Sequence, residues 1–205
     1  MTDLLTRYGW IGGMGGSLSM VAVAVVLTLD GGDLRDGLVW FLVAVGAAAW
    51  MACLVGCAYV HGDRDNLSLW SGVSMAALGL VAWVAGWAGF FIGGLDGGAN
   101  PTMSGWLVFT AIALGAIGVV LGLAVFGGGT VAAKVLPWWG RTVPLLMAAS
   151  LPLATLVNRL RGERSILLNS VAFVVFAAGW IVLGLASRAS YMSSLETAPP
   201  DAPSA

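Results

Sequence analysis

The chain has 205 residues, of which 59% are hydrophobic and 9% are charged, and its mean hydropathy is +0.94. A soluble domain carries about 25% charged residues, so this composition excludes a water-soluble globular protein. The formal net charge of -1 gives no bulk attraction to nucleic acid, and no nucleic-acid partner is expected. The length accommodates one bundle of about six membrane helices and leaves no room for a second domain.

Six apolar stretches follow one another along the chain, and no Asp, Glu, Lys or Arg lies inside any of them. Only helices and closed barrels satisfy the backbone in lipid, and these stretches lack the alternation typical of barrel strands. We therefore predict an all-α, polytopic transmembrane bundle of six helices. The predicted helices are Tyr8–Leu29, Leu38–Val60, Leu69–Ile92, Met103–Phe126, Thr142–Val157 and Ile166–Leu185.

The connections between these stretches are short and rich in Gly, Asp and Asn, which favours antiparallel packing of successive helices. Beyond Arg188 the sequence turns to Ser, Glu, Ala and Pro, a composition that cannot bury a core. We expect residues 1–188 to form the helix bundle and residues 189–205 to form a disordered tail.

Glycines recur at regular spacing in the third and fourth stretches. Small residues on one helix face let a second backbone approach closely, and a seven-residue period follows a left-handed crossing. The face either packs within the bundle or binds a membrane-protein partner or a second copy of the chain; the sequence leaves both readings open. The glycines of this predicted packing face are Gly72, Gly79, Gly86, Gly93, Gly118 and Gly122.

A candidate solute path involves the third and fifth stretches. Trp83, Trp87 and Phe90 form an aromatic ridge that either bounds a groove for a quinone, isoprenoid or lipid tail or simply packs. Two prolines frame the middle of the fifth stretch, and broken helices form substrate sites in transporters, although ordinary kinks give the same pattern. The residues of the candidate path are Trp83, Trp87, Pro144, Ser150 and Pro152.

The fifth stretch decides the predicted topology, because it has only 16 residues and is flanked by Arg141 and Arg159. If it crosses the membrane, five Lys and Arg residues lie on the N-terminal side and four on the other. If it is re-entrant, the counts become seven and two, which places the N-terminus in the cytoplasm. We predict that it crosses, in a multi-pass cell-membrane protein whose N-terminus is cytoplasmic.

A small basic loop follows the fifth stretch. Its cations are Arg159, Arg161 and Arg164, accompanied by Glu163. Facing the cytoplasm, such a loop attracts anionic lipid headgroups with roughly 1 kcal/mol per charge. The alternative is a purely topogenic role, in which the arginines set the orientation of the helices.

Cys53, Cys57 and His61 share one helix face, and thiolate with imidazole suits copper or zinc. Three ligands spread over two turns of one helix span ~12 Å, too far to bind one ion together. We therefore expect no metal and no cofactor. The sequence contains no HExxH motif, no phosphate-binding loop and no set of nucleophile, histidine and acid, so an enzyme is disfavoured.

The last third of the chain resembles a loose group of uncharacterised small polytopic membrane proteins of bacteria and archaea. The matching segments are Leu136-Pro137-Trp138-Trp139-Gly140 and Gly179-Trp180-Ile181-Val182-Leu183-Gly184. The resemblance covers about a quarter of the chain and implies a six-helix membrane fold of prokaryotic origin, with no particular activity.

Three hypotheses for the function follow. The first is a non-enzymatic membrane protein that acts by packing its helices against a partner, a second copy or lipid. The second is a transporter or facilitator for a small or apolar solute, and the third is a membrane enzyme on a lipid or isoprenoid substrate.

Overall fold

The structure is a computed structural model that describes residues 2–26, 33–60, 67–92, 103–134, 136–162 and 165–197. Within these residues the chain is helical and has no strand, which confirms the predicted all-α bundle of six helices. All six helices are long and apolar enough to cross a bilayer, so the chain is a multi-pass integral membrane protein. The helices are α1 (Thr2–Val26), α2 (Asp33–Val60), α3 (Leu67–Ile92), α4 (Met103–Ala133), α5 (Val143–Arg161) and α6 (Ile166–Thr197).

Several helices are longer than the apolar stretches that predicted them. Whereas the stretches end at Phe126 and Leu185, α4 runs to Ala133 and α6 to Thr197. Hydropathy marks the part of a helix in hydrocarbon, whereas the helix itself continues into the interface because its backbone hydrogen bonds remain internal. Residues 189–197, which the sequence analysis assigned to the tail, therefore continue α6.

The short fifth stretch forms one uninterrupted helix, α5, rather than a re-entrant loop. Pro152 lies inside it and cannot donate the backbone hydrogen bond of its turn. Two nearby hydroxyls donate to carbonyls of the same helix: Ser150 Oγ to Met147 at 2.9 Å and Thr155 Oγ1 to Leu151 at 2.9 Å. These bonds satisfy the two hydroxyl groups within the helix itself, as a lipid environment requires.

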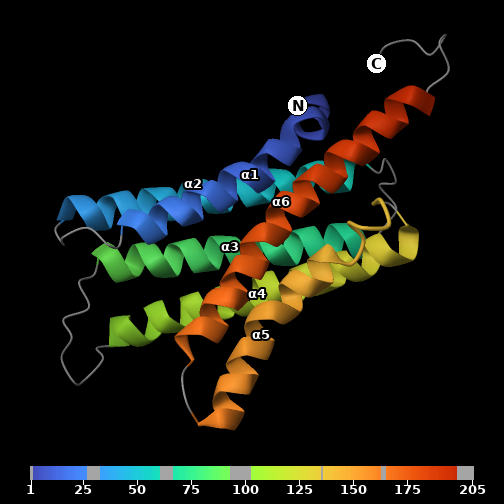
Figure 1. Cartoon of the computed structure of the whole chain (residues 1–205). Helices are drawn as coiled ribbons and strands as arrows, with labels where there is room; N and C mark the ends of the chain where they lie inside the picture. Colours follow the sequence, from blue (N-terminus) through green and yellow to red (C-terminus); the bar gives the residue numbers. More distant parts are fainter. Residues whose placement is uncertain are drawn as a thin grey trace.

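The helices form a ring with two tight antiparallel pairs, α1 with α2 and α3 with α4 (Figure 1). Next in the ring, α5 contacts α4 and α6, and α6 crosses back over the molecule to contact α1 and α2. We refer to the end of the bundle where α1 begins as the N-terminal end, and to the other as the opposite end. The arginines and lysine described at the N-terminal end are Arg7, Lys134, Arg141 and Arg188, and those at the opposite end are Arg35, Arg159 and Arg161.

Glycines bring α1 close to two neighbours at once. A methyl group added at Gly9 would lie 2.9 Å from the Gly56 Cα of α2, and one added at Gly16 would lie 2.8 Å from the Gly46 carbonyl oxygen. On the face toward α6, the Ser17 hydroxyl donates to the Ala177 carbonyl at 2.8 Å. Close backbone approach joined by a hydroxyl is typical of helix association in lipid. These contacts hold α6 across the α1–α2 pair.

The connection from α4 to α5 is a compact turn at the N-terminal end. Lys134 leaves α4 in the left-handed backbone region, with φ of 53°, and Leu136 is buried beneath the turn. The Arg141 side chain donates through Nε to the Leu136 carbonyl at 2.7 Å, and the buried Thr130 hydroxyl donates to the Arg141 carbonyl at 3.0 Å. These bonds fix the start of α5 against the end of α4.

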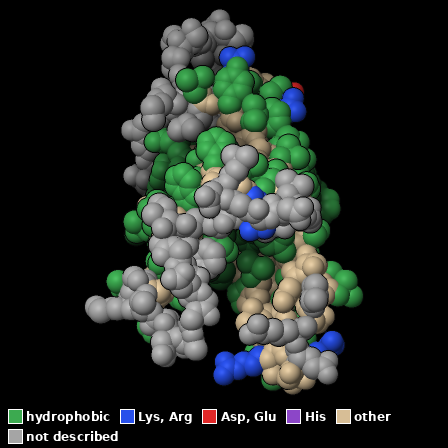
Figure 2. Space-filling view, turned by 90° about the vertical axis from the view of Figure 1, so that its left-hand side faces the viewer, with side chains coloured by type: hydrophobic (Ala, Val, Ile, Leu, Met, Phe, Trp, Pro, Cys, Tyr) green, Lys and Arg blue, Asp and Glu red, His purple; other side chains and the backbone are tan. Residues whose placement is uncertain are grey.

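At the opposite end, α5 diverges from α4 and forms a hairpin with the first half of α6 (Figure 1). Gly162 closes α5 with φ of 70°, a left-handed conformation that glycine adopts without strain. Asn158 then bridges the turn, donating to Asn169 at 2.8 Å and accepting from the Ser165 backbone N–H at 3.0 Å. Figure 2 shows the tip of this hairpin, with its blue cations, standing apart from the rest of the molecule.

Candidate functional site

A cavity of about 90 Å³ lies in the middle of the helix ring. It exists because, among the described residues, α6 makes no close backbone contact with α3 or α4. Side chains alone fill the space between these helices, and they do not fill it completely. The cavity is therefore a product of the ring arrangement and lies roughly halfway along the bundle.

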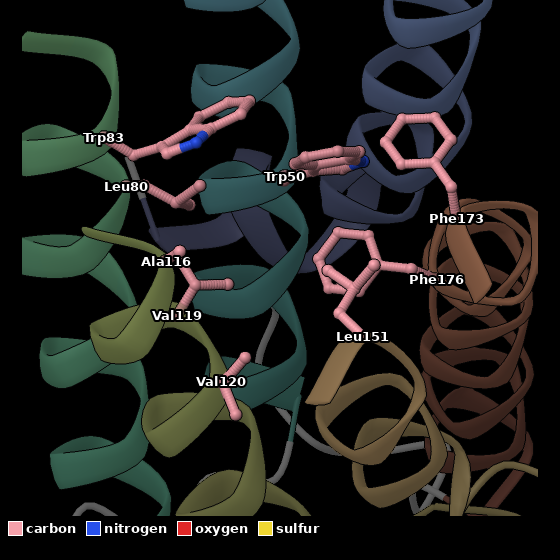
Figure 3. Close-up of a pocket in the computed structure, with 9 residues that line it drawn as sticks. All are labelled: Trp50, Leu80, Trp83, Ala116, Val119, Val120, Leu151, Phe173 and Phe176. Atoms are coloured by element: carbon pink, nitrogen blue, oxygen red, sulfur yellow. The ribbon is translucent and has the colours of Figure 1, made fainter. Parts of the chain in front are cut away.

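Five helices contribute the walls, and their side chains converge on one shared space (Figure 3). All of the wall residues are apolar and none is charged, so the cavity offers contact to hydrocarbon and no ionic group to a polar substrate. The wall consists of Trp50 from α2, Leu80 and Trp83 from α3, Ala116, Val119 and Val120 from α4, Leu151 from α5, and Phe173 and Phe176 from α6.

An aromatic cluster makes one wall rigid. The Trp50 and Trp180 rings stack with centroids 5.1 Å apart and planes 10° apart, and Phe176 meets both edge-on, at 5.6 Å and 6.1 Å. Glycines of α1 leave room behind these rings, since a methyl group at Gly16 would collide with the Trp50 ring. Offset and edge-to-face contacts stabilise such clusters beyond simple packing.

The indole N–H groups of Trp50 and Trp180 have no hydrogen-bond partner among the described residues. A buried N–H without a partner costs about 1–3 kcal/mol. The two indoles therefore place aromatic surface in the core at a cost to the stability of the folded bundle.

The cavity opens sideways between α4 and α6. Ala116 and Phe173 are the exposed members of its wall, one on each of these two helices, and the helices themselves do not touch. Because wall residues of both helices are exposed, an acyl chain of the surrounding bilayer can reach the cavity without passing through water.

The structure brings only part of the predicted solute path to this cavity. Trp83 lines it, and Trp87 packs edge-on against Trp83 with centroids 6.3 Å apart but does not belong to the wall. From α5 the wall residue is Leu151, whereas its neighbour Pro152 is exposed.

The remaining predicted path residues lie elsewhere. Pro144 is buried at the N-terminal end, and Ser150 lines a different groove, between α5 and α6. The side chain of Phe90 lies outside the described part of the chain.

The glycines of the predicted packing face lie between α3 and α4. A methyl group added at Gly72 would lie 2.8 Å from the Phe126 Cα, and one at Gly86 would lie 2.6 Å from Ile112 Cγ1. Gly79 and Gly118 approach each other directly, with 2.8 Å from a methyl group at Gly118 to the Gly79 Cα.

Each glycine stripe is thus covered by the facing helix within one chain. Gly122 faces Ala76 in the same way, while Gly93 lies outside the described residues.

Cys53 and Cys57 are fully buried where α2 meets α6, and Cys57 Sγ lies 4.0 Å from the Leu183 carbonyl oxygen. They occupy the interior as small hydrophobic side chains. His61 lies outside the described residues, among which no cluster of potential metal ligands occurs. Arg159 and Arg161 are exposed in the last turn of α5, and Arg164 is not described.

Sequence reasoning missed most of the cavity wall. Trp50, Phe173 and Phe176 sit in uniformly apolar stretches, where no polar face marks the inward side of the helix. The one available signal was the spacing Phe173, Phe176 and Trp180, which places three aromatic rings on one face of α6. That signal identifies a face but not the helices opposite it.

Comparisons of the chain with protein-family models, with curated proteins and with solved structures find no match.

Proposed function

We propose that this integral membrane protein is not an enzyme and acts by packing its helices against lipid, with a hydrocarbon chain held in the central cavity. The observation that carries the proposal is the apolar cavity of about 90 Å³ that opens between α4 and α6. A cavity lined by apolar side chains stays free of water and accepts apolar molecules. In a bilayer the molecules available at this depth are acyl chains and apolar solutes of similar character.

The packing of the glycine faces supports lipid over a protein partner as the occupant. The stripes on α3 and α4 that attract a second helix are already in mutual contact, as are the glycines of α1 with α2. The cavity mouth, where Ala116 and Phe173 are exposed, remains open to a new contact.

The test uses a phospholipid that carries a photoreactive diazirine at the end of one acyl chain. In reconstituted bilayers we expect labelling of the inward-facing Leu151 and Phe176, detected by mass spectrometry of peptides. Ala116→Phe places a ring in the mouth and should lower this labelling; losing about 1.4 kcal/mol of chain binding lowers it tenfold.

The matched control for this test is Ala132→Phe, the same substitution at an exposed position of α4 that is not part of the cavity wall. It should leave the inward labelling unchanged. Labelling confined to outward-facing residues such as Leu114 and Leu121 in the wild-type chain would refute the proposal.

A second candidate, a facilitator for a small apolar solute, is favoured by the position of Leu151. This wall residue directly precedes Pro152, so a change in the bend of α5 moves the wall of the cavity. Under this candidate, Pro152→Ala restores a backbone N–H to α5, stiffens the helix and lowers solute flux into liposomes. Equal flux with the wild-type and Pro152→Ala chains, at equal protein density, would count against transport and leave the lipid-binding proposal in place.

A further inference from the structure

The outer face of the α5–α6 hairpin carries a second apolar groove, of about 330 Å³, separate from the central cavity. Leu151 faces the cavity, whereas the groove is lined by other positions of the same helix, including Leu146, Ser150, Leu153 and Val157. From α6, Leu168 and Val175 complete the wall. The twelve residues from Leu146 to Val157 span about 16 Å at 1.5 Å per residue, which matches one leaflet of a hydrocarbon core about 30 Å thick.

Two exposed arginines lie at the end of this groove. Arg161 follows Val157 by four residues, so it continues the same face of α5 by one turn. Arg159 lies in the same last turn, and the sequence from 158 to 165 holds three arginines and one glutamate. Guanidinium groups bind phosphate oxygens in a bidentate manner, so this end of the groove is complementary to an anionic headgroup.

We propose that the groove binds one anionic phospholipid, with an acyl chain along α5 and α6 and the phosphate against Arg159 and Arg161. The occupant is a lipid and not a second copy of the chain, because a two-fold contact places the same patch on both subunits. Such a contact would bring the arginines of two copies together, whereas an anionic lipid neutralises them. The site uses no residue of the central cavity, so this proposal does not depend on the proposed function.

The experiment is native mass spectrometry of the chain purified from detergent with equal amounts of phosphatidylglycerol and phosphatidylcholine of identical acyl chains. We expect the wild-type chain to retain one phosphatidylglycerol in preference to phosphatidylcholine. Each arginine near the surface contributes about a fivefold preference for anionic lipid, so Arg159→Gln with Arg161→Gln should lower it roughly 25-fold at low salt. The double substitution Arg7→Gln with Lys134→Gln, which removes two exposed cations from the N-terminal end, should leave the preference unchanged.

A second variant tests the groove itself. Ala149→Phe fills the groove at an exposed wall position and should remove the retained lipid, while Ala132→Phe should keep it. A wild-type preference in the double Gln variant, or a retained phosphatidylglycerol in Ala149→Phe, would overturn the proposal. All substituted positions are exposed, so we expect each of these variants to fold as the wild-type chain does.

Discussion

Replacing Trp180 by alanine should lower the stability of the bundle by about 3 kcal/mol, the largest single effect that we expect in this chain. Trp180 is fully buried, stacks on Trp50 at 5.1 Å and meets Phe176 edge-on. Removing its indole leaves a void bordered by α1, α2 and α6. In a membrane the separated helices are also surrounded by hydrocarbon, so the cost comes from lost packing contacts and not from transfer to water.

Two further variants make this prediction sharp. Trp180→Phe keeps an aromatic ring and removes an N–H group that has no partner among the described residues, so part of the packing loss is offset. Its cost should be about 1 kcal/mol. Trp138→Ala removes an indole that is 81% exposed in the α4–α5 turn and should change the stability by less than about 0.5 kcal/mol.

The measurement is the free energy of unfolding in mixed micelles titrated with a denaturing detergent. A Trp180→Ala chain as stable as the Trp138→Ala chain would show that the aromatic cluster does not hold α6 to α2 as described. A Trp180→Phe chain that loses as much stability as Trp180→Ala would contradict the expectation that an aromatic ring at this position retains most of the packing.

In this membrane protein, hydropathy predicts the helices but not which of their faces line the cavity. The six helices were predictable because charge is excluded from hydrocarbon, and the ends of the apolar stretches are marked by residues such as Asp30, Arg141 and Arg159. The inward faces of the helices were not predictable, because lipid-facing and protein-facing positions are equally apolar. Phe176, which is buried in the cavity wall, and Val174, which is exposed, are both strongly apolar and cannot be assigned to different faces by hydropathy.

Small residues were the one class that carried packing information. Gly72, Gly79 and Gly86 stand out at seven-residue spacing because lipid exposure gives no reason for such regularity. The spacing could not name the partner, since a stripe of glycines fits any helix that presents a second stripe. The structure pairs it with Gly115, Gly118 and Gly122 on the next helix, which a short connection also favours.

Gly122→Ala and Gly128→Ala, the same substitution on the same helix, should change the stability in opposite directions. A methyl group at Gly122 would lie 2.7 Å from the Ala76 Cα and would also meet the Ala76 backbone nitrogen, so α3 and α4 must separate. Overpacking of this kind costs about 1–3 kcal/mol. A methyl group at Gly128 meets nothing within 4 Å, and alanine is favoured over glycine inside a helix by roughly 0.5–1 kcal/mol.

The same detergent titration measures both variants, and their difference is the informative quantity because expression, helix and chemistry are matched. This difference should amount to about 1.5–4 kcal/mol if the two backbones are in direct contact, since it is the sum of the overpacking cost and the propensity gain. Equal stabilities would mean that α3 and α4 are not held together at Gly122, and a second helix would then have to be sought for the glycine stripe of α3. Because the cavity wall draws Leu80 and Trp83 from α3 and Val119 from α4, loosening this pair should also reduce the labelling of Leu151 by the photoreactive lipid.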